Sequence, residues 1–536
     1  MIHSKQLIFL LKIYIFIILI IFNVLPLLSQ DSILSDGDLN EAEFSVAINP
    51  TDSNNIVLAT IYGVGTDNGS GDSDSDYLKI YYTNDFGETW QLSNFHGVIE
   101  GYKLAGDPVL SFDENGNLFL INLSLDENFN SIPTFLSNSL DGGATWSSAA
   151  ILKENSFSDK PWMAIDRYGS SPFKGNIYIP LVLNDVRLIC LDNELQIIHD
   201  HQISDGNHLP SVVVKKNGDV FTSTVQLGIE NEVFVQKYAN GGADFSHSSS
   251  VVSFPDYTFN APDISTRFQP TVYLAIDNSE GIYEGRIYLS YTASEENNAD
   301  YFDIFLSFSD DDGLTWSVPK IVHTDQQDQV QQFYSSIYVN DSGVLILDWY
   351  DRGNYENTNK LTDFFMGISY DGGETFTELQ LNSLSTDFEE IIEFGSGFGI
   401  GEYHQCIATN NTAISFWSDG RTNDGDLNIY FAKVSLQDPT TGVEELSVIS
   451  TELSISLPYP QPVTERVFID IDLKVDTKLK YEIVNNTGVK IWISNWLSFK
   501  QGNHTLEIPV NVAAGVYYLR VVAENGYFKS RKIIKL

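Results

Sequence analysis

Short apolar stretches separated by polar turns run along most of this chain, and their spacing predicts β-strands rather than helices. One stretch, with the outline P-x-V-x-V-D/N, recurs seven times between residues 44 and 410. Turn signals such as DENGN, KKNGD and NDSG follow the copies. The copies are FSVAIN (44–49), PVLSFD (108–113), PWMAID (161–166), PSVVVK (210–215), PTVYLAID (270–277), YSSIYVN (334–340) and HQCIATN (404–410).

Two more apolar stretches follow each copy; NIVLATIY and LKIYYTN are the first such pair, and TAISFWSD and LNIYFAK the last. A module of about 40–70 residues that is nearly all strand has two exposed sheet edges and cannot bury both faces alone. A closed ring of modules covers both faces of each one. We therefore predict an all-β fold in which residues 31–436 form a seven-bladed β-propeller without helices.

An octapeptide closes the third stretch of several modules, reading TNDFGETW at 83–90, SLDGGATW at 139–146, SDDDGLTW at 309–316 and SYDGGETF at 369–376, with a weaker copy at 238–245. Its aspartate is suited to accept hydrogen bonds from its own turn, its glycine supplies conformational freedom, and its aromatic residue is suited to pack between blades. The predicted role is structural for Asp85, Trp90, Asp141, Trp146, Asp311, Trp316, Asp371 and Phe376.

This octapeptide is similar to the Asp-box, or BNR repeat, so residues 41–436 resemble the sialidase-like β-propeller family. That family includes sialidases and other secreted, glycan-active proteins. What the resemblance implies is a propeller fold and an extracellular glycan as ligand.

The chain changes character after a polar linker at 437–456. Residues 457–536 hold 11 Lys+Arg against 7 Asp+Glu, a net charge of +4, whereas residues 31–456 hold 17 against 65, a net of −48. Alternating stretches such as RVFIDIDL and GVYYLRVV predict a small immunoglobulin-like β-sandwich. The pieces YPQPV, NNTGVKIW, AAGVYYLRV and KSRKIIKL resemble the C-terminal sorting domain of the type IX secretion system of Bacteroidota. The alternative is an ordinary sugar-binding appendage.

The resemblance of the tail implies the type IX secretion machinery as a partner and a location outside the cell, either free or on the outer-membrane surface. Residues 1–30 support export, because Lys5 and Lys12 flank the start of an apolar run that ends in Ser29 and Gln30, typical of a cleaved signal peptide. A membrane anchor is the alternative, although Asn23 and Pro26 interrupt the run. We expect no membrane span in the mature chain, and a monomer.

The net charge of −42 argues against nucleic acid as a partner, since phosphates need Lys and Arg to neutralise them. The two cysteines, Cys190 and Cys406, lie in apolar runs and are predicted to be buried thiols. No spacing indicates zinc, and no cofactor is required by the sequence. The DSDSD run around Asp74 leaves calcium open, with a solvated loop as the alternative.

Propeller topology places the Asp-boxes on one face and the candidate site on the other, around the central funnel. The candidate ligand-binding residues on that face are Arg267, Arg352, Arg421, Asp351, Asp159, Lys160, His208 and His404. Arginine forks bind carboxylates in bidentate fashion. The alternative is that each arginine braces its own loop by pairing with a neighbouring aspartate.

Resemblance to sialidases implies Asp72 or a neighbouring residue as the acid, Tyr403 as the nucleophile, Glu402 as its helper, and the three arginines as the residues that bind the substrate carboxylate. The chain departs from that pattern, because Glu43-Phe44-Ser45 stands where sialidases carry Arg-Ile-Pro, and sialidases have six blades. We therefore expect glycan recognition without appreciable sialidase activity. An active exo-sialidase or other glycoside hydrolase, and a non-enzymatic adhesion or protein-binding propeller, remain the alternatives.

Overall fold

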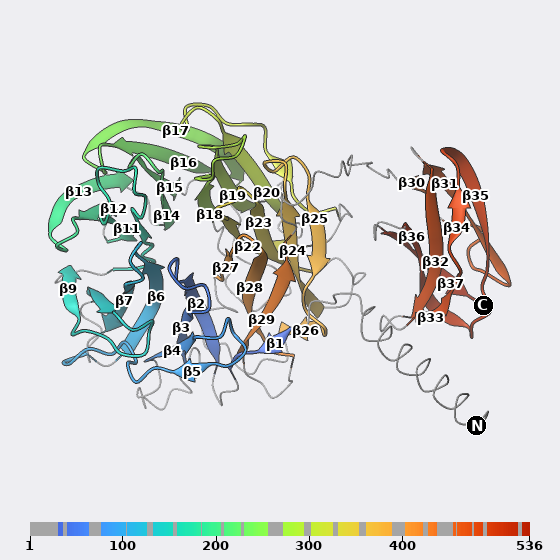
Figure 1. Cartoon of the computed structure of the whole chain (residues 1–536), viewed down its shortest axis with the longest axis horizontal. Coiled ribbons are helices and arrows are strands. Elements are labelled where there is room, and N and C mark those ends of the chain that lie inside the picture. The colour runs from blue at the N-terminus through green and yellow to red at the C-terminus, as the bar shows by residue number, and fades with distance from the viewer. Residues whose placement is uncertain are drawn as a thin grey trace, which may run out of the picture. The chain divides into compact units, whose positions relative to one another are not determined.

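The computed structural model divides the chain into two compact units, Met1–Gln437 and Asp438–Leu536, which are described separately (Figure 1). The described residues are 31–35, 40–63, 77–102, 104–125, 132–153, 158–183, 185–204, 208–226, 230–255, 272–293, 302–324, 331–352, 361–388, 403–421, 427–436, 454–456, 458–473, 476–485, 490–523 and 528–536. They contain strands and turns but no α-helix, and no helix among them is long and apolar enough to cross a membrane. The all-β prediction is confirmed.

Antiparallel sheets follow one another along the described part of the first unit, most with their strands in chain order. The first two hold β2 (Glu41–Ile48), β3 (Ile56–Tyr62), β4 (Tyr77–Thr83) and β5 (Gln91–Leu92), then β6 (Leu104–Phe112), β7 (Leu118–Leu125), β8 (Thr134–Ser139) and β9 (Ala150–Lys153). The next two hold β10 (Ala164–Ile165), β11 (Ile177–Val182), β12 (Val186–Leu191) and β13 (Ile197–Ser204), then β14 (His208–Val214), β15 (Val220–Gln226), β16 (Glu230–Ala239) and β17 (Asp244–Pro255).

The last three sheets of this unit complete the series. They hold β18 (Val272–Ile276), β19 (Ile287–Ala293), β20 (Asp303–Ser309) and β21 (Lys320–Ile321); then β22 (Gln332–Val339), β23 (Leu345–Asp351), β24 (Leu361–Ser369) and β25 (Thr377–Gln380), with β26 (Thr386–Asp387) also on β24; then β27 (Cys406–Ala408), β28 (Thr412–Asp419) and β29 (Asn428–Ser435). The N-terminal strand β1 (Ser32–Ile33) adds to this last sheet by pairing with β29.

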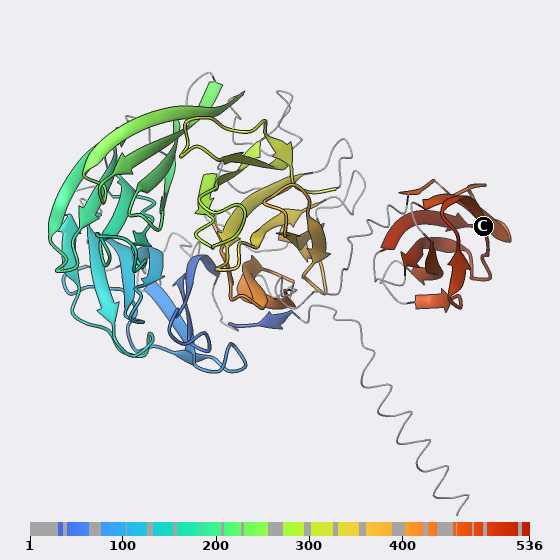
Figure 2. The same ribbon diagram turned by 45° about the horizontal axis from the view of Figure 1, so that its top comes forward.

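The sheets of the first unit form a ring (Figure 2). Each sheet contacts the next, and β2 of the first sheet contacts β27 and β29 of the last. Second strands such as β3, β11, β19 and β23 are buried almost throughout, because each sheet is covered on both faces by its neighbours. Fourth strands such as β5 and β13 are largely exposed.

Serine hydroxyls join neighbouring inner strands at one position of the repeat. The hydroxyl of Ser45 accepts a hydrogen bond from the backbone N–H of Leu110 at 2.9 Å. Ser211 accepts from Leu274 at 3.2 Å, and Ser336 accepts from Cys406 at 3.0 Å. These bonds hold the first strands of adjacent sheets in a common register, so residues at the same repeat position lie at the same height in the ring.

The Asp-box turns join the third and fourth strands of their sheets. At the first of them, Thr89 donates to Asp85 through its backbone N–H at 2.9 Å and through its hydroxyl at 2.6 Å, and the Thr83 hydroxyl donates at 2.6 Å. Trp90 lies edge-on to Phe416 and Phe431 of the last sheet, with ring centres 6.2 and 5.9 Å away. The turn thus organises its own backbone and places an aromatic ring between two sheets.

These turns make the stability of the first unit sensitive to acid. Hydrogen bonds from Thr83 and Thr89 lower the pKa of Asp85 to about 2. A carboxyl group with a pKa of roughly 3.9 in the unfolded chain then stabilises the fold above about pH 4, and this contribution is lost as the pH falls toward 2. We expect Asp85→Asn to be less stable at pH 6 and to lose less stability than the native protein between pH 4 and 2. The urea unfolding midpoints of both proteins, measured between pH 6 and pH 2, test this prediction. An equal loss of stability with falling pH in the two proteins would contradict it.

The second unit is built from two sheets that share one apolar core. One holds β30 (Ser454–Ile455), β31 (Arg466–Leu473) and β35 (Gly502–Pro509); the other holds β33 (Lys490–Ile493), β32 (Thr477–Asn485), β36 (Gly515–Ala523) and β37 (Phe528–Lys535), with β34 (Leu497–Phe499) on β32. Ser454 and Ile455 pair with Asp472 and Ile471, so the first sheet begins before residue 457.

Candidate functional site

The hydrogen bonds that close the first turn of each sheet align the repeats residue by residue. The last residue of each inner stretch, or in the seventh stretch the residue before the last, donates its backbone N–H to a carbonyl at or just before the start of the next strand, at 2.9–3.1 Å. The donors are Asn49, Asp113, Asp166, Lys215, Asp277, Asn340 and Thr409, with distances of 3.0, 2.9, 2.9, 2.9, 3.0, 3.1 and 2.9 Å. Counting back six positions from each in the sequence gives Glu43, Asp107, Lys160, Leu209, Thr271, Tyr334 and Tyr403.

The backbone is strained at this repeat position. Glu43, Asp107, Lys160 and Tyr334 have φ angles of +52°, +47°, +44° and +48°. In β2, β6 and β22 the strand register shifts across the same residues. Residues other than glycine rarely adopt positive φ, and such strain gathers at functional sites. Several first strands thus have a bulge at the same repeat position, and the residue in the bulge, which has a polar side chain, is left out of the regular strand pairing.

Four of these side chains meet, and we call them the central cluster: Glu43, Asp107, Lys160 and Tyr403. The backbone N–H of Lys160 donates to Asp107 Oδ2 at 3.0 Å, and Lys160 Nζ lies 3.4 Å from Glu43 Oε1. The Tyr403 hydroxyl donates to Asp107 Oδ1 at 3.5 Å, a long bond, and Lys160 Nζ lies 5.1 Å from the Tyr403 ring centre. Glu43, Asp107 and Tyr403 are buried, and Lys160 is half-buried. The cluster thus brings together two carboxylates, a phenol and one ammonium group, with Glu43 on the ammonium of Lys160 and Asp107 on its backbone N–H.

Aromatic rings flank the central cluster. Trp162, two residues after Lys160, is half-buried, and its ring lies edge-on to Tyr403 with centres 6.4 Å apart. Tyr273 of β18 lies on another side of Trp162, with ring centres 5.2 Å apart. A half-buried ring such as that of Trp162 is suited to packing on the apolar face of a ligand.

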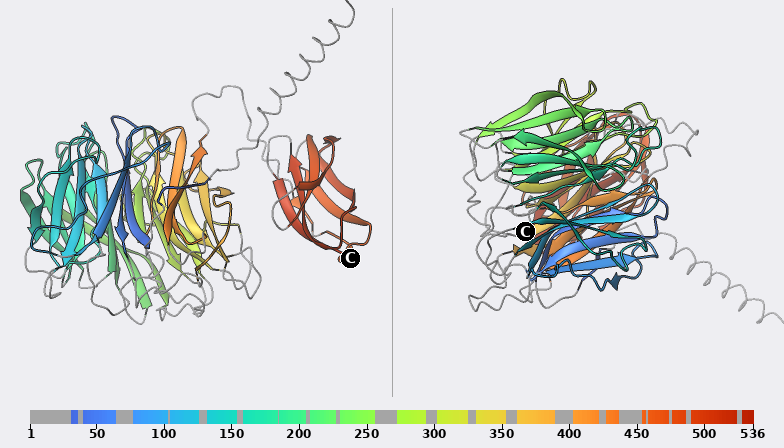
Figure 3. Two further views of the ribbon diagram at one scale, coloured as in Figure 1. Left: turned by 90° about the horizontal axis from the view of Figure 1, so that it is seen from below. Right: turned by 90° about the vertical axis from the view of Figure 1, so that its left-hand side faces the viewer.

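Strand direction separates this cluster from the Asp-boxes. The strands of the first unit run between its two faces (Figure 3, left). Because paired strands are antiparallel, the start of a first strand and the turn between third and fourth strands fall at opposite ends of a sheet. The cluster therefore lies on the face opposite the Asp-box turns.

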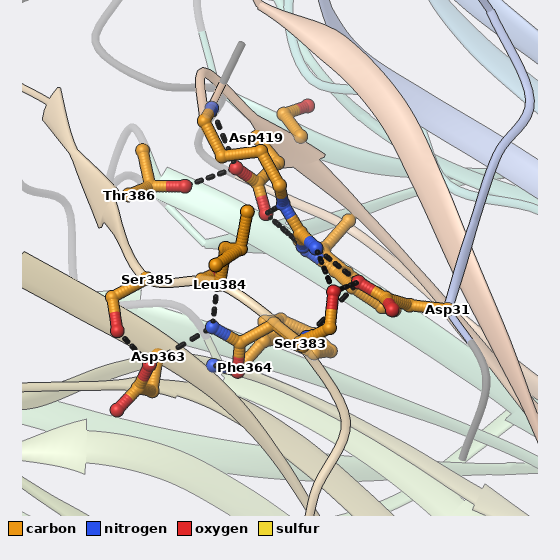
Figure 4. Close-up of polar contacts among 12 residues, drawn as sticks. Asp31, Asp363, Phe364, Ser383, Leu384, Ser385, Thr386 and Asp419 are labelled. Carbon is orange, nitrogen blue, oxygen red and sulfur yellow. Dashed lines mark hydrogen bonds and ion pairs between the residues drawn. The ribbon is translucent and has the colours of Figure 1, made fainter. Parts of the chain in front are cut away.

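Two acidic side chains, Asp31 and Asp419, which are labelled in Figure 4, engage the guanidinium of Arg421. Its guanidinium pairs with Asp31 and with Asp419, and Nε donates to Asp419 Oδ2 at 2.9 Å. Asp31 also accepts bonds of 3.1 Å from the backbone N–H and the hydroxyl of Ser383. The Arg421 guanidinium lies 4.2 Å from the ring centre of Tyr430. These contacts tie the N-terminal strand to the last two sheets.

The other candidate residues fall at several places. Arg352 is buried at the end of β23 and donates to Gln331 Oε1 at 2.8 Å, while Asp351 accepts from Gln332 at 3.2 Å. Asp159 is exposed and forms a β-bridge with Val182. His404 is buried against Asp348.

Four predicted residues have side chains outside the described part of the structure. They are Asp72, Arg267 and Glu402, together with His208, of which only the backbone is described, at the start of β14. The acidic run around Asp74, where calcium was left open, lies there too. Among the described residues, no group of three or more His, Cys, Asp or Glu side chains is placed to hold a metal ion.

The structure places Glu43 and Asp107 in the site together with Lys160 and Tyr403. From the sequence, Glu43 served only to show that an expected arginine is missing. The signal that marks both is the polar residue six positions before the turn residue of an inner stretch. It becomes visible only when the repeats are aligned by their turns.

Residues 458–536 match the secretion system C-terminal sorting domain, and residues 81–92 match the BNR/Asp-box repeat. None of the curated proteins matches this chain. A solved protein of unknown function from Dyadobacter fermentans is 12% identical with a TM-score of 0.44, over 76% of this chain and 98% of that one. An α-L-arabinanase from Penicillium chrysogenum is 12% identical (TM-score 0.41; 76% and 97% covered), and an intramolecular trans-sialidase from Ruminococcus gnavus is 14% identical (TM-score 0.40; 66% and 96%).

The two sequence matches confirm both resemblances predicted from the motifs. The first unit thus contains a segment, residues 81–92, that is similar to the BNR/Asp-box repeat, and residues 458–536 of the second unit are similar to the secretion system C-terminal sorting domain.

Proposed function

We propose that this chain is a secreted or cell-surface protein, exported by the type IX system, whose seven-bladed propeller recognises extracellular glycan at the central cluster. The described residues of the first unit form seven consecutive sheets, with the last contacting the first, and this supports the blade count. The sorting-domain match over 458–536 supports export. The immunoglobulin-like tail serves as the export signal.

The observation that carries glycan recognition is the convergence of strained polar residues from different sheets. Asp107 and Glu43 present carboxylate oxygens, which accept hydrogen bonds from sugar hydroxyls. Trp162 offers a half-buried ring for the apolar face of a sugar. A few convergent polar groups beside aromatic rings are typical of small-ligand sites.

The charge of the cluster favours a neutral glycan over sialic acid. The cluster holds two carboxylates and a single ammonium group, on a unit that is itself strongly acidic. A carboxylate on the ligand would meet like charges at short range, where effective screening by solvent is weak. Arg421, one of the predicted arginines for a sialoside, is already paired with Asp31 and Asp419.

We expect Asp107→Asn to weaken binding of a neutral oligosaccharide by about 10- to 100-fold, since a hydrogen bond to a charged group contributes roughly 1.5–3 kcal/mol. A glycan array with the purified protein selects the oligosaccharide, and isothermal titration calorimetry measures the dissociation constant. Asp200→Asn, on the outer strand β13, is the matched control and should leave affinity unchanged. Absence of binding by the native protein would overturn the proposal; capture of a protein ligand alone would favour an adhesion role.

Glycoside hydrolysis is the second candidate function. It is favoured by the pair of buried carboxylates, Glu43 and Asp107, that contact the same lysine. Paired carboxylates are the groups that most glycosidases use as acid and base or nucleophile. Release of 4-methylumbelliferone from a panel of neutral glycosides and a sialoside tests it. Turnover of the sialoside alone would instead restore the exo-sialidase alternative.

A further inference from the structure

Three consecutive residues, Tyr403, His404 and Gln405, lead into the inner strand β27 and reach three different sheets. The Tyr403 hydroxyl donates to Asp107 of β6. His404 Nε2 lies 2.9 Å from Asp348 Oδ1 of β23. Gln405 Oε1 accepts bonds from Ser45 of β2, through the hydroxyl at 2.9 Å, and from the backbone N–H of Val46 at 2.7 Å. This tripeptide therefore links the last sheet to the second, sixth and first.

The contact between His404 and Asp348 is almost fully enclosed. His404 is 2% exposed and Asp348 is 0% exposed. The Ser336 hydroxyl donates to the same oxygen of Asp348 at 2.5 Å, and also accepts the bond from the backbone of Cys406. The rings of Tyr350 and Phe364 lie edge-on to the imidazole, with centres 5.4 and 5.1 Å away. The pair is thus held by a polar bond inside an aromatic cage.

A contribution to the stability of the fold does not explain why His404 and Asp348 are buried together. His404 Nδ1 and Asp348 Oδ2 are buried without a hydrogen-bond partner among the described residues. Each buried polar atom left in that state costs free energy, and well-packed apolar residues are often as stable or more stable at such places. The pair instead fixes the orientation of the imidazole ring, because a hydrogen bond is directional whereas apolar packing alone permits the ring to rotate.

We propose that Asp348 and His404 form a positioning pair that holds Tyr403 against Asp107 in the central cluster. His404 and Tyr403 are joined by one peptide bond, so anchoring the imidazole to β23 limits where the phenol can lie. The structural part of the proposal concerns the position of Tyr403; its role in glycan affinity rests on the proposed function. Asp348 and His404 act through Tyr403 and are positioning residues.

The structural part is tested without any ligand. A 3-fluorotyrosine placed at position 403 reports the surroundings of the phenol by 19F NMR. We expect His404→Phe, which fills the cage but has no polar atom, to shift and broaden this resonance. His404→Gln keeps a donor amide and should restore the native resonance. His199→Phe, on the outer strand β13, is the control. An unchanged resonance in folded His404→Phe would overturn the proposal.

A double-mutant cycle tests the link to affinity, using the neutral oligosaccharide selected on the array. His404→Phe should weaken binding about tenfold in the native background, and less than about twofold once Tyr403→Phe has removed the hydroxyl. Additive losses would mean that His404 acts independently of Tyr403 and would overturn the proposal. If the native protein binds no glycan but the resonance still responds, the positioning role stands and the proposed function falls.

Discussion

Replacing Arg421 by methionine is expected to lower the free energy of unfolding of the first unit by about 3–5 kcal/mol, because it leaves buried acidic groups without their cation. The side chains of Arg421, Asp31 and Asp419 are 5%, 6% and 3% exposed. Asp31 directly precedes β1, the strand that completes the last sheet by pairing with β29. Loss of the cation therefore leaves two buried carboxylates without their ion pair. It also removes the bond between Arg421 and Asp31 that holds the N-terminal strand to the last sheet.

Urea unfolding followed by circular dichroism measures this change. Arg187→Met is the matched control, because Arg187 of β12 pairs with Asp185 and with Asp200 of the outer strand β13, and its side chain is 26% exposed. There we expect a loss of about 1 kcal/mol or less. Equal losses of unfolding free energy in the two variants would show that burial of the Arg421 ion pairs does not increase their contribution to stability.

Replacing Trp349 by alanine is expected to destabilise the first unit by a similar amount, about 3–5 kcal/mol, because it leaves a large cavity. Trp349 lies fully buried in β23 and stacks on Phe365, with ring centres 6.2 Å apart. It packs in one apolar cluster with Tyr288 and Leu306 of the preceding sheet. Gly367 makes room for it, since a Cβ there would lie 3.1 Å from the indole ring.

The unfolding midpoint of Trp349→Ala is compared with that of Trp496→Ala. Trp496 belongs to the second unit and is 45% exposed, so its loss should cost less than about 1 kcal/mol. A small effect of Trp349→Ala would mean that neighbouring sheets close over the cavity and do not depend on this side chain for their spacing.

Several features of this protein follow from the sequence because their causes are local. Alternating apolar residues between turn signals form strands wherever one or both faces become covered. The Asp85 turn is organised by Thr83 and Thr89, within four residues of it. The change in charge after residue 456 and the strand pattern beyond it mark the tail as a separate unit. The strands and the Asp-box turns were accordingly predictable.

The central cluster was decided only by the tertiary structure, because its members come from different repeats. Lys160 lies 117 residues from Glu43, and Tyr403 lies 296 residues from Asp107. No local pattern joins such pairs; they meet because the ring brings the same repeat position of different sheets close together. Arg421 shows the same dependence. Its sequence neighbour Asp419 was a foreseeable partner, but Asp31, 390 residues away, reaches it only because the N-terminal strand closes the last sheet.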